Sequence, residues 1–456
     1  MLTYELKKSP GVPLYEALYR CIRGDILSGN LPAGEKLPSK RALAENLEVS
    51  KITVEAAYNQ LLSEGYIRSR EKVGYFVEAV ERVQPQAAPK AQPEEPRKSA
   101  PRLDLTGGGT VQFPFSVWSK LQREVMLDYG EQLLLPMPHQ GIPELRQAIA
   151  SHLAQFRGLQ VDPDRILIGA GGDFLYNLLI QLLGRDKVYA VEEPGYGKIR
   201  KIYGAGGVAC ISAGMDGFGV RPDSLADARV LHISPSHHFP TGLVTPMHRR
   251  LELLQWAERV DGYIIEDDYD SEFRFDAHPM SAMQSLDRQG RVIYMNSFSK
   301  SLAPSIRISY MVLPEGLMAQ FREKLGFYGC TVPSFEQYTL ARFLSRGYFE
   351  KHINRMRKFY KNRRNRVVSL LENCAFAEKL TILEQDAGLH FILKVDTELS
   401  DEALTAALGE AGVRIQPLSH YYHGNPGQHQ HHLVVNYAGV DESLLEQVLD
   451  TLSGIF

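Results

Sequence analysis

The chain has 456 residues, of which 44% are hydrophobic and 23% are charged, and its formal net charge is −3. This length predicts two or three domains, and the apolar content excludes an intrinsically disordered protein. The small net charge excludes a protein that coats nucleic acid indiscriminately, so any DNA binding must be confined to one module.

Targeting and redox signals indicate a soluble, cytoplasmic protein. The N-terminal segment MLTYELKKSP has no apolar region of the secretory type, and no apolar run reaches the roughly 18 residues of a membrane helix. The four cysteines are far apart and form no CxxC pair. This spacing favours reduced thiols over a disulfide framework or a zinc site.

The first module, about residues 10–78, carries the pattern of a DNA reader. Residues 13–28 have apolar positions at helical spacing, beginning with a proline suited to a first turn. Ser39 is placed to cap a short helix, and Ser50 to cap a second helix over residues 51–63. Two short helices joined by a tight turn predict a helix-turn-helix, whose second helix enters the major groove.

A hairpin follows the second of these helices. Residues 65–68 and 74–77 predict its two strands, with Arg70 and Lys72 at its tip. A hairpin at this position is the wing of a winged helix-turn-helix.

The segment LPSKRALAENLEVSKITVEAAYNQLLSEGYI, followed by VGYFV, resembles the GntR-family winged helix across nearly all of residues 13–77. The resemblance implies binding to double-stranded DNA, in which phosphate contacts dominate the affinity and make it salt-dependent. An ordinary solvated face is the alternative, because residues 1–77 hold 11 Lys and Arg against 9 Asp and Glu. The residues that the resemblance places at DNA or in the wing are Arg41, Ser50, Lys51, Thr53, Lys72 and Gly74.

Composition changes sharply after the hairpin. Residues 81–101 contain five prolines, little apolar surface and mixed charge. Such a stretch cannot bury enough surface to fold, and it predicts a semi-rigid, extended linker over residues 79–101. The remaining residues, 102–456, form the second and larger module.

The larger module predicts an α/β fold with a mostly parallel sheet and helices on both faces. The segments RILIGAGG, KVYAVEEPGY, ARVLHISPS, GYIIEDDY and RVIYMNSFSK are typical of short buried strands. Helical patterns, such as residues 173–183 and 246–259, lie between some of them. Further along, a long basic helix at roughly residues 345–373 leads into a smaller C-terminal α/β subdomain, about residues 345–456.

Residues at the ends of these strands match the needs of pyridoxal 5'-phosphate (PLP): a lysine, an acid at the pyridine nitrogen, a donor at the ring oxygen and a phosphate cradle. Lys300 follows the strand RVIYMN, at the carboxyl edge where open α/β sheets bind ligands. Arg307 can hold a phosphate with its guanidinium fork. Gly171 and Gly172 open a helix whose backbone N–H groups are free for phosphate.

The ring end of this site is predicted from two other strands. Asp267 and Tyr269 are two residues apart, so they project to the same side of an extended chain. The carboxylate can hold the pyridinium while the phenol meets the ring oxygen. Tyr196, in the sequence PGY, can stack on the ring. Each feature alone is common, but their combination at strand ends predicts a PLP site.

The segments PSHHFPTG, IIEDDYDSEF, NSFSKSLAPSIRISYMVLP and AGLHF resemble fold-type I aminotransferases, and more closely the MocR/GabR branch of the GntR regulators. The resemblance implies a head-to-tail homodimer and a Schiff-base lysine, Lys300. It implies Asp267 at the pyridinium, Tyr269 at the ring oxygen and Tyr196 in stacking. It adds Ser297 and Ser299 near the phosphate with Arg307, and His237 near the ring.

The chain departs from the GABA sensor of that branch, which holds its effector's carboxylate with arginines. Gly439 stands where the arginine of the C-terminal strand would fall, and Lys198 stands at the second position. A lysine keeps the charge but cannot form a fork. We therefore expect the effector to be PLP itself, as in vitamin B6 regulators, or an amino compound.

A histidine-rich segment near the C-terminus adds candidates for the effector pocket, His420 and His423, beside Lys198. The histidine spacing matches no metal motif, so no metal is expected. The arginines of the long helix form either a solvated face or a second contact to the DNA backbone.

The sequence thus predicts a PLP-dependent transcriptional regulator of the MocR/GabR type, in which turnover is not required. One alternative is an active aminotransferase with an accessory DNA-binding domain. Another is a DNA-binding protein whose pocket is purely structural.

Overall fold

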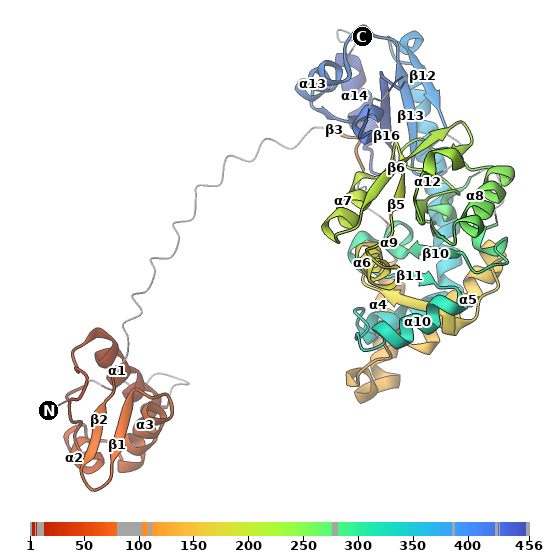
Figure 1. Ribbon diagram of the computed structural model, residues 1–456. Helices are drawn as coiled ribbons and strands as arrows, with labels where there is room; N and C mark the ends of the chain where they lie inside the picture. Colours follow the sequence, from red (N-terminus) through yellow and green to blue (C-terminus); the bar gives the residue numbers. More distant parts are fainter. Residues whose placement is uncertain are drawn as a thin grey trace. The chain divides into compact units, whose positions relative to one another are not determined.

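The computed structural model describes residues 2–4, 6, 13–79, 103–107, 112–275, 281–384, 388–424, 427 and 429–452. The chain divides into two units, residues 1–98 and 99–456 (Figure 1). The predicted proline-rich linker segment, residues 81–101, lies outside the described residues.

The N-terminal unit is a three-helix module followed by a hairpin. Its elements are α1 (Leu14–Ser28), α2 (Lys40–Asn46), α3 (Lys51–Ser63), β1 (Ile67–Arg70) and β2 (Gly74–Val77). The side chain of Ser39 accepts a hydrogen bond from the backbone N–H of Ala42, and Ser50 accepts one from Thr53. Both predicted helix caps are therefore confirmed, because each satisfies an N–H group that has no partner within its helix.

The hairpin of this unit is antiparallel, with Ile67 opposite Val77 and Arg70 opposite Gly74. Lys72 lies in its turn with a φ of 58°, as predicted. Arg70 was also predicted at the tip, but it is the last residue of strand β1. The two helices, the hairpin and α1 share one apolar core, which contains the fully buried Leu18.

The second unit is built on an eight-stranded sheet in the order β4-β11-β10-β9-β8-β5-β6-β7. The strands are β4 (Ile166–Gly169), β5 (Tyr189–Glu193), β6 (Cys210–Asp216), β7 (Gly219–Val220), β8 (Val230–Ile233), β9 (Tyr263–Asp267), β10 (Val292–Ser297) and β11 (Ser309–Val312). Strands β6, β5, β8, β9 and β10 pair in parallel, while β11 and β7 are antiparallel to their neighbours. The predicted mostly parallel sheet is confirmed.

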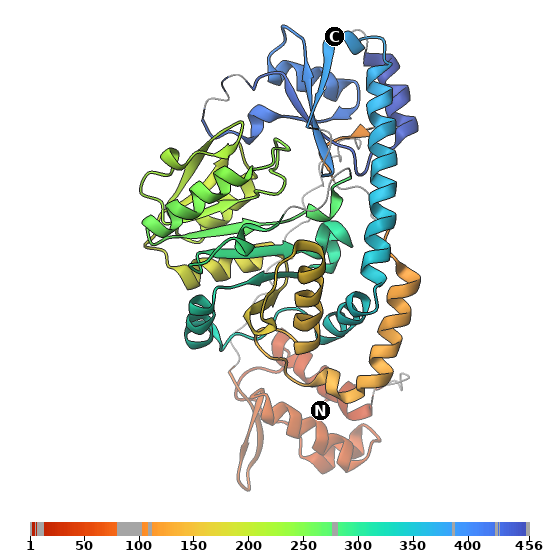
Figure 2. The same cartoon turned by 90° about the vertical axis from the view of Figure 1, so that its right-hand side faces the viewer.

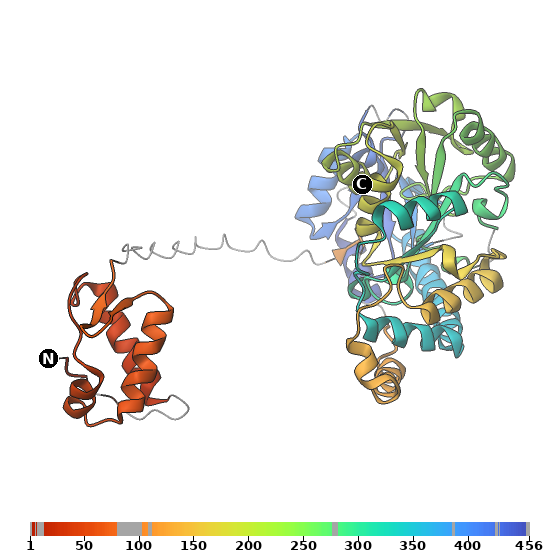
Figure 3. The ribbon, with the colours of Figure 1, turned by 60° about the horizontal axis from the view of Figure 1, so that its bottom comes forward.

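Helices cover both faces of this sheet (Figure 3). The helices of this part of the unit are α4 (Phe115–Tyr129), α5 (Pro143–Arg157), α6 (Gly172–Leu183), α7 (Gly197–Ala205), α8 (Met247–Arg259), α9 (Phe298–Ser301), α10 (Glu315–Leu325) and α11 (Ser334–Ser345). Side chains alternate along β10: Ile293 and Met295 pack in the cluster that holds α6 and α10. Val292 packs in the cluster with α8, and Tyr294 in the one with α5 and α11. Both faces are buried, as expected for a parallel sheet.

The C-terminal subdomain contains a second sheet, with strand order β12-β13-β16-β15. Its elements are α12 (Tyr348–Glu372), β12 (Leu380–Leu383), β13 (His390–Val395), α13 (Asp401–Glu410), β14 (Val413–Arg414), β15 (Gln416–Pro417), β16 (His432–Asn436) and α14 (Glu442–Leu452). A short strand from the start of this unit, β3 (Leu103–Asp104), pairs in parallel with β14. The first described residues of the unit therefore belong to its C-terminal subdomain.

The long helix α12 runs beside both parts of this unit (Figure 2). Its apolar face is buried, as at Phe349 and Ile353. Two of its arginines contact the chain itself: Arg357 donates to the backbone carbonyl of Glu272 at 2.5 Å, and Arg363 donates to that of Ala438 at 2.5 Å. These contacts give the basic face of the helix a structural role within the unit.

The structure also bears on the redox and membrane expectations. All four cysteines are free thiols. Within the described part of the chain, no helix combines the length and apolar character that crossing a membrane requires.

Candidate functional site

A cavity of about 420 Å³ opens at the carboxyl ends of β9 and β10, beside the N-terminus of α6. This is the edge where open α/β sheets bind ligands. Of the ten residues that the sequence assigns to a cofactor, eight line this cavity: Gly172, Tyr196, Asp267, Tyr269, Ser297, Ser299, Lys300 and Arg307. The other two, Gly171 and His237, are not among its described lining residues.

Asp267 lies at the floor of the cavity and is held by two polar partners. Its Oδ2 accepts a hydrogen bond from the hydroxyl of Tyr176 at 2.5 Å and lies 3.4 Å from Nε2 of His232. The other ring nitrogen of His232 lies 2.7 Å from the hydroxyl of Tyr203. Burial, and then the charge of Asp267, raise the pKa of Tyr176, so its phenol stays neutral and donates to the carboxylate.

Sequence reasoning did not identify Tyr176, His232 or Tyr203. His232 had a signal, because it is a polar residue within the apolar strand β8. The two tyrosines had none, since an aromatic residue on a buried helix face is indistinguishable from ordinary core. Together the three side chains fix the orientation of Asp267 towards the cavity.

The opposite end of the cavity has the features of an anion cradle. Helix α6 begins after Gly171, which has a φ of 89° and no side chain to cap the helix. The N–H groups of the first turn therefore remain available for an anion. Arg307 adopts a left-handed backbone conformation, and its Nη2 donates to the carbonyl of Ala170 at 3.1 Å. A Cβ at Gly171 would lie 2.7 Å from Cζ of Arg307, so this approach requires glycine.

Two serines complete this end of the site. The side chain of Ser297 caps the one-turn helix α9 by accepting a hydrogen bond from the N–H of Ser299. Its hydroxyl also donates to that of Ser299 at 2.9 Å. Lys300 is the next residue of α9, and its exposed side chain lines the cavity. The lysine thus follows the strand end as predicted, but on a helical turn.

Tyr269 lies on the cavity wall with His237 behind it. The Tyr269 hydroxyl is 3.3 Å from Nδ1 of His237, which is itself 2.8 Å from Oδ2 of Asp270. Burial raises the pKa of Tyr269, and the neighbouring carboxylate of Asp270 adds to this effect. His237 is only 3% exposed and packs against Gly388, so it supports Tyr269 from behind the wall.

The three candidates for an effector pocket do not line the cavity. Lys198, on α7, binds the carboxylate of Asp173 at 2.7 Å. His420 and His423 are exposed, and the backbone N–H of His423 donates to Oε1 of Glu193 at 3.0 Å. Within the residues that the structure describes, no cluster of metal-ligating side chains occurs.

The charges on the cavity wall limit what the cavity can bind. Lys300 and Arg307 are the only lysine and arginine among its described lining residues. The C-terminal strand β16 contributes Asn436, an uncharged side chain, and Gly439 lies beyond the end of that strand. The described wall therefore offers two cations, Lys300 on α9 and Arg307 beside the start of α6.

The residues assigned to DNA lie on the surface of the N-terminal unit. Arg41 is exposed on α2, where it pairs with Glu45 at 3.0 Å. Ser50 caps α3, and Lys51 and Thr53 lie in its first turn, with 2.8 Å between the hydroxyls of Ser50 and Thr53. Lys72 and Gly74 lie in and beside the hairpin turn, where each has a positive φ.

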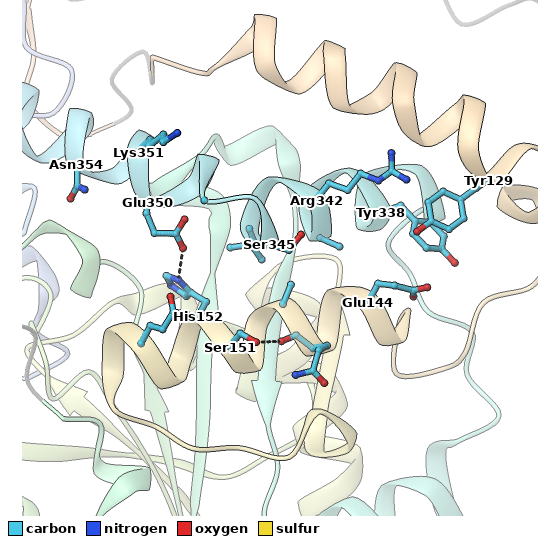
Figure 4. Close-up of a pocket in the computed structure, with 16 residues that line it drawn as sticks. Tyr129, Glu144, Ser151, His152, Tyr338, Arg342, Ser345, Glu350, Lys351 and Asn354 are labelled. Atoms are coloured by element: carbon cyan, nitrogen blue, oxygen red, sulfur yellow. Dashed lines mark hydrogen bonds and ion pairs between the residues drawn. The ribbon is translucent and has the colours of Figure 1, made fainter.

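A second cavity, of about 820 Å³, lies between α4, α5, α11 and α12 (Figure 4). Its wall carries charges of both signs, including Glu144, Arg342 and Lys351. His152 points towards Glu350, with 3.7 Å between Nδ1 and Oε1. None of its described lining residues is a predicted cofactor, effector or DNA residue. This larger cavity is therefore not the site that the sequence predicts.

Comparison with known proteins identifies both units. Residues 14–77 match the family of bacterial regulatory proteins called gntR, and residues 105–452 match the family called aminotransferase class I and II. A solved structure of kynurenine aminotransferase from Pyrococcus horikoshii, in complex with PMP, is 26% identical with a TM-score of 0.67. The likeness covers 77% of this chain and 89% of the aminotransferase.

Relatives with both units cover nearly the whole chain. The regulator YdeL of Bacillus subtilis is 36% identical over 99% of this chain and 98% of its own length. The probable rhizopine catabolism regulatory protein MocR of Rhizobium meliloti is 34% identical over 99% and 95%. The pyridoxine biosynthesis transcriptional regulator PdxR of Corynebacterium glutamicum is 31% identical over 95% and 93%.

Proposed function

This chain belongs to the MocR/GabR-type regulators, which join a gntR-family helix-turn-helix to an aminotransferase class I and II domain, and we propose that it regulates transcription in response to PLP itself. The alternative effector is an amino compound captured by bound PLP. The observation that carries the proposal is the distribution of charge in the cavity. Both cations of the described wall are needed by the cofactor, which leaves none there for an effector's carboxylate.

The residues of the cavity fit PLP from end to end. Lys300 would bind the cofactor covalently, and Asp267 would accept a hydrogen bond from its pyridine nitrogen. When bound, PLP supplies an aldehyde that condenses with a primary amine. Tyr269 would donate to the ring oxygen, and Tyr196 would stack on the ring. The phosphate would lie with Ser297, Ser299, Arg307 and the start of α6, where Gly171 is the N-cap and Gly172 the first helical residue.

The chain's own side chains prepare this site. Tyr176 donates to Asp267, and His232 lies on the same carboxylate oxygen, so Asp267 is oriented before a ligand arrives. His237 holds the position of Tyr269 on the wall. In this proposal the residues bind and orient a ligand, and no turnover is required.

The N-terminal unit would bind double-stranded DNA through α3 and the hairpin. Arg41, Lys51 and Lys72 would contact phosphates, and the exposed first turn of α3 would reach base edges in the major groove. The net charge of −3 supports a local contact of this kind over a general affinity for nucleic acid.

The test measures DNA binding and cofactor binding in one sample. A duplex is first selected from a random-sequence pool on the wild-type protein, and its affinity is then measured with and without PLP. Absorbance of the lysine-bound cofactor is followed in parallel. We expect PLP to change the DNA affinity, and Lys300→Ala to abolish both signals. Lys324→Ala, on the exposed surface of α10, is the matched control.

Two outcomes decide between the effectors. If PLP binds and the DNA affinity stays constant, PLP is not the signal, and amino compounds must be screened on the PLP-loaded protein. If Lys300→Ala still regulates DNA binding like the wild type, the pocket is structural and the proposal is wrong.

We also propose that the protein forms a homodimer through its second unit. Large apolar side chains are exposed on and near α4, with Phe115 at 72%, Leu127 at 77% and Leu134 at 75% exposure. Phe327 is 78% exposed in the same unit. Exposed apolar side chains of this size mark interaction surfaces when they are contiguous. Sedimentation of the wild type and Leu127→Glu tests this, because a monomeric wild type contradicts it.

A further inference from the structure

Asp173 places a negative charge at the end of the cavity where the cofactor's phosphate is expected. It lies in the first turn of α6 and on the cavity wall. Its Oδ2 is 2.7 Å from Nζ of Lys198 and 3.6 Å from Nη2 of Arg307. The carboxylate therefore already neutralises part of the positive charge of Arg307, which a phosphate would need.

Asp173 and a phosphate would compete for the same cation. The Arg307 guanidinium is held near the start of α6 by the Ala170 carbonyl and by close contact with Gly171. A phosphate monoester is largely dianionic at neutral pH, so its arrival brings like charges together at Asp173. Lys198 offers the carboxylate a second partner, and it does not line the cavity itself.

We propose that Asp173 sets the affinity for PLP by competing with the cofactor phosphate for Arg307. The carboxylate weakens phosphate binding, and its existing ion pair with Lys198 offsets part of this effect. Lys198 is thus a partner of Asp173 and not a holder of an effector's carboxylate. The identity of the ligand in this inference rests on the proposed function.

Weakened binding suits a concentration sensor. Occupancy responds to ligand concentration only near the dissociation constant, so a site that is always filled reports nothing. The side chains of Asp173, Lys198 and Arg307 are 37%, 47% and 52% exposed, so solvent screens their charges in part. An effect of about tenfold on the dissociation constant is appropriate for charges at this separation and exposure.

The test compares two ligands that differ only by the phosphate. Full-length protein is titrated with PLP and with pyridoxal, and binding is read from the absorbance of the lysine-bound ligand. Asp173→Asn removes the charge and retains the shape of the side chain. The matched control is Asp186→Asn, which removes a charge from an exposed side chain outside the cavity wall.

Asp173→Asn should tighten PLP binding by about tenfold and leave pyridoxal binding unchanged, while Asp186→Asn changes neither. Lys198→Gln should weaken PLP binding in the wild type and have no effect in the Asp173→Asn background. The inference is overturned if Asp173→Asn leaves the ratio of the two dissociation constants unaltered, or if Lys198→Gln weakens PLP binding equally in both backgrounds. Failure of the proposed function has a different signature, since the protein would then bind PLP without any change in DNA affinity.

Discussion

Asp267 and Asp268 are adjacent in the chain, and substituting each with asparagine should separate cofactor binding from stability. Asp267 faces the cavity, where Tyr176 contacts it. Asp268 faces the other side of the sheet and is 2% exposed. There it forms an ion pair with Arg157 at 3.1 Å and accepts a hydrogen bond from the hydroxyl of Tyr294 at 2.6 Å.

The contacts of Asp268 determine the size of the expected effect. Asp268→Asn keeps the shape of the side chain but leaves Arg157, which is 5% exposed, without its ion-pair partner. Glu266 and Glu272 are poor substitutes, because burial raises the pKa of both and disfavours their charged forms. Breaking a buried pair in this way lowers the free energy of unfolding by about 3 kcal/mol. Asp267→Asn should cost about 1 kcal/mol or less, because it alters hydrogen bonds beside an open cavity.

Tryptophan fluorescence during urea unfolding measures both effects. The only two tryptophans, Trp118 and Trp256, are buried in the second unit, so their signal reports that unit alone. PLP is omitted, because ligand binding would stabilise the wild type and mask the comparison. A PLP titration of the same variants should show weakened binding for Asp267→Asn. Equal stability losses for the two variants, or wild-type stability for Asp268→Asn, would refute the reasoning.

Three further predictions concern both units. Ser39→Ala removes the acceptor for the N–H of Ala42 and should lower the free energy of unfolding of residues 1–98 by about 1 kcal/mol. Circular dichroism of that fragment measures this loss, and an unchanged melting curve contradicts the prediction. Lys72→Ala should reduce the slope of log DNA affinity against log salt concentration by about 1. An unaltered slope would show that Lys72 in the hairpin does not contact a DNA phosphate. Tyr203→Phe leaves Nδ1 of His232 without its hydroxyl partner and should weaken PLP binding by about fivefold. If the variant binds PLP as tightly as the wild type, this hydroxyl does not support Asp267.

The sequence predicted those features whose cause is local. Ser39 and Ser50 were identifiable as caps because a helix start depends on a side chain within three residues of the N–H that it satisfies. Asp267 and Lys300 were identifiable because Asp267 ends a buried strand and Lys300 lies three residues beyond the end of another, and parallel strands end at one edge of the sheet.

The remaining features depend on packing between distant segments, which spacing does not reveal. Tyr176 meets Asp267 only because α6 lies over the end of β9. His237 is placed behind Tyr269 because it packs in the space left by Gly388, which comes from the C-terminal subdomain. Asp173 had the pattern of an ordinary first-turn acid, and its contact with Arg307 requires β11 to be in place.

The short segment over residues 103–107 connects three parts of the molecule. Leu103 and Leu105 donate backbone hydrogen bonds to the strand region around β14, and the carbonyl of Leu105 accepts one from Asn436 at 2.9 Å. The next two residues, Thr106 and Gly107, form part of the cavity wall. The first described residues of the second unit are therefore fastened to the C-terminal subdomain and also lie on the cavity wall. Under the proposed function, a displacement of that subdomain on ligand binding would also displace residues 103–107, which are the first described residues of the second unit.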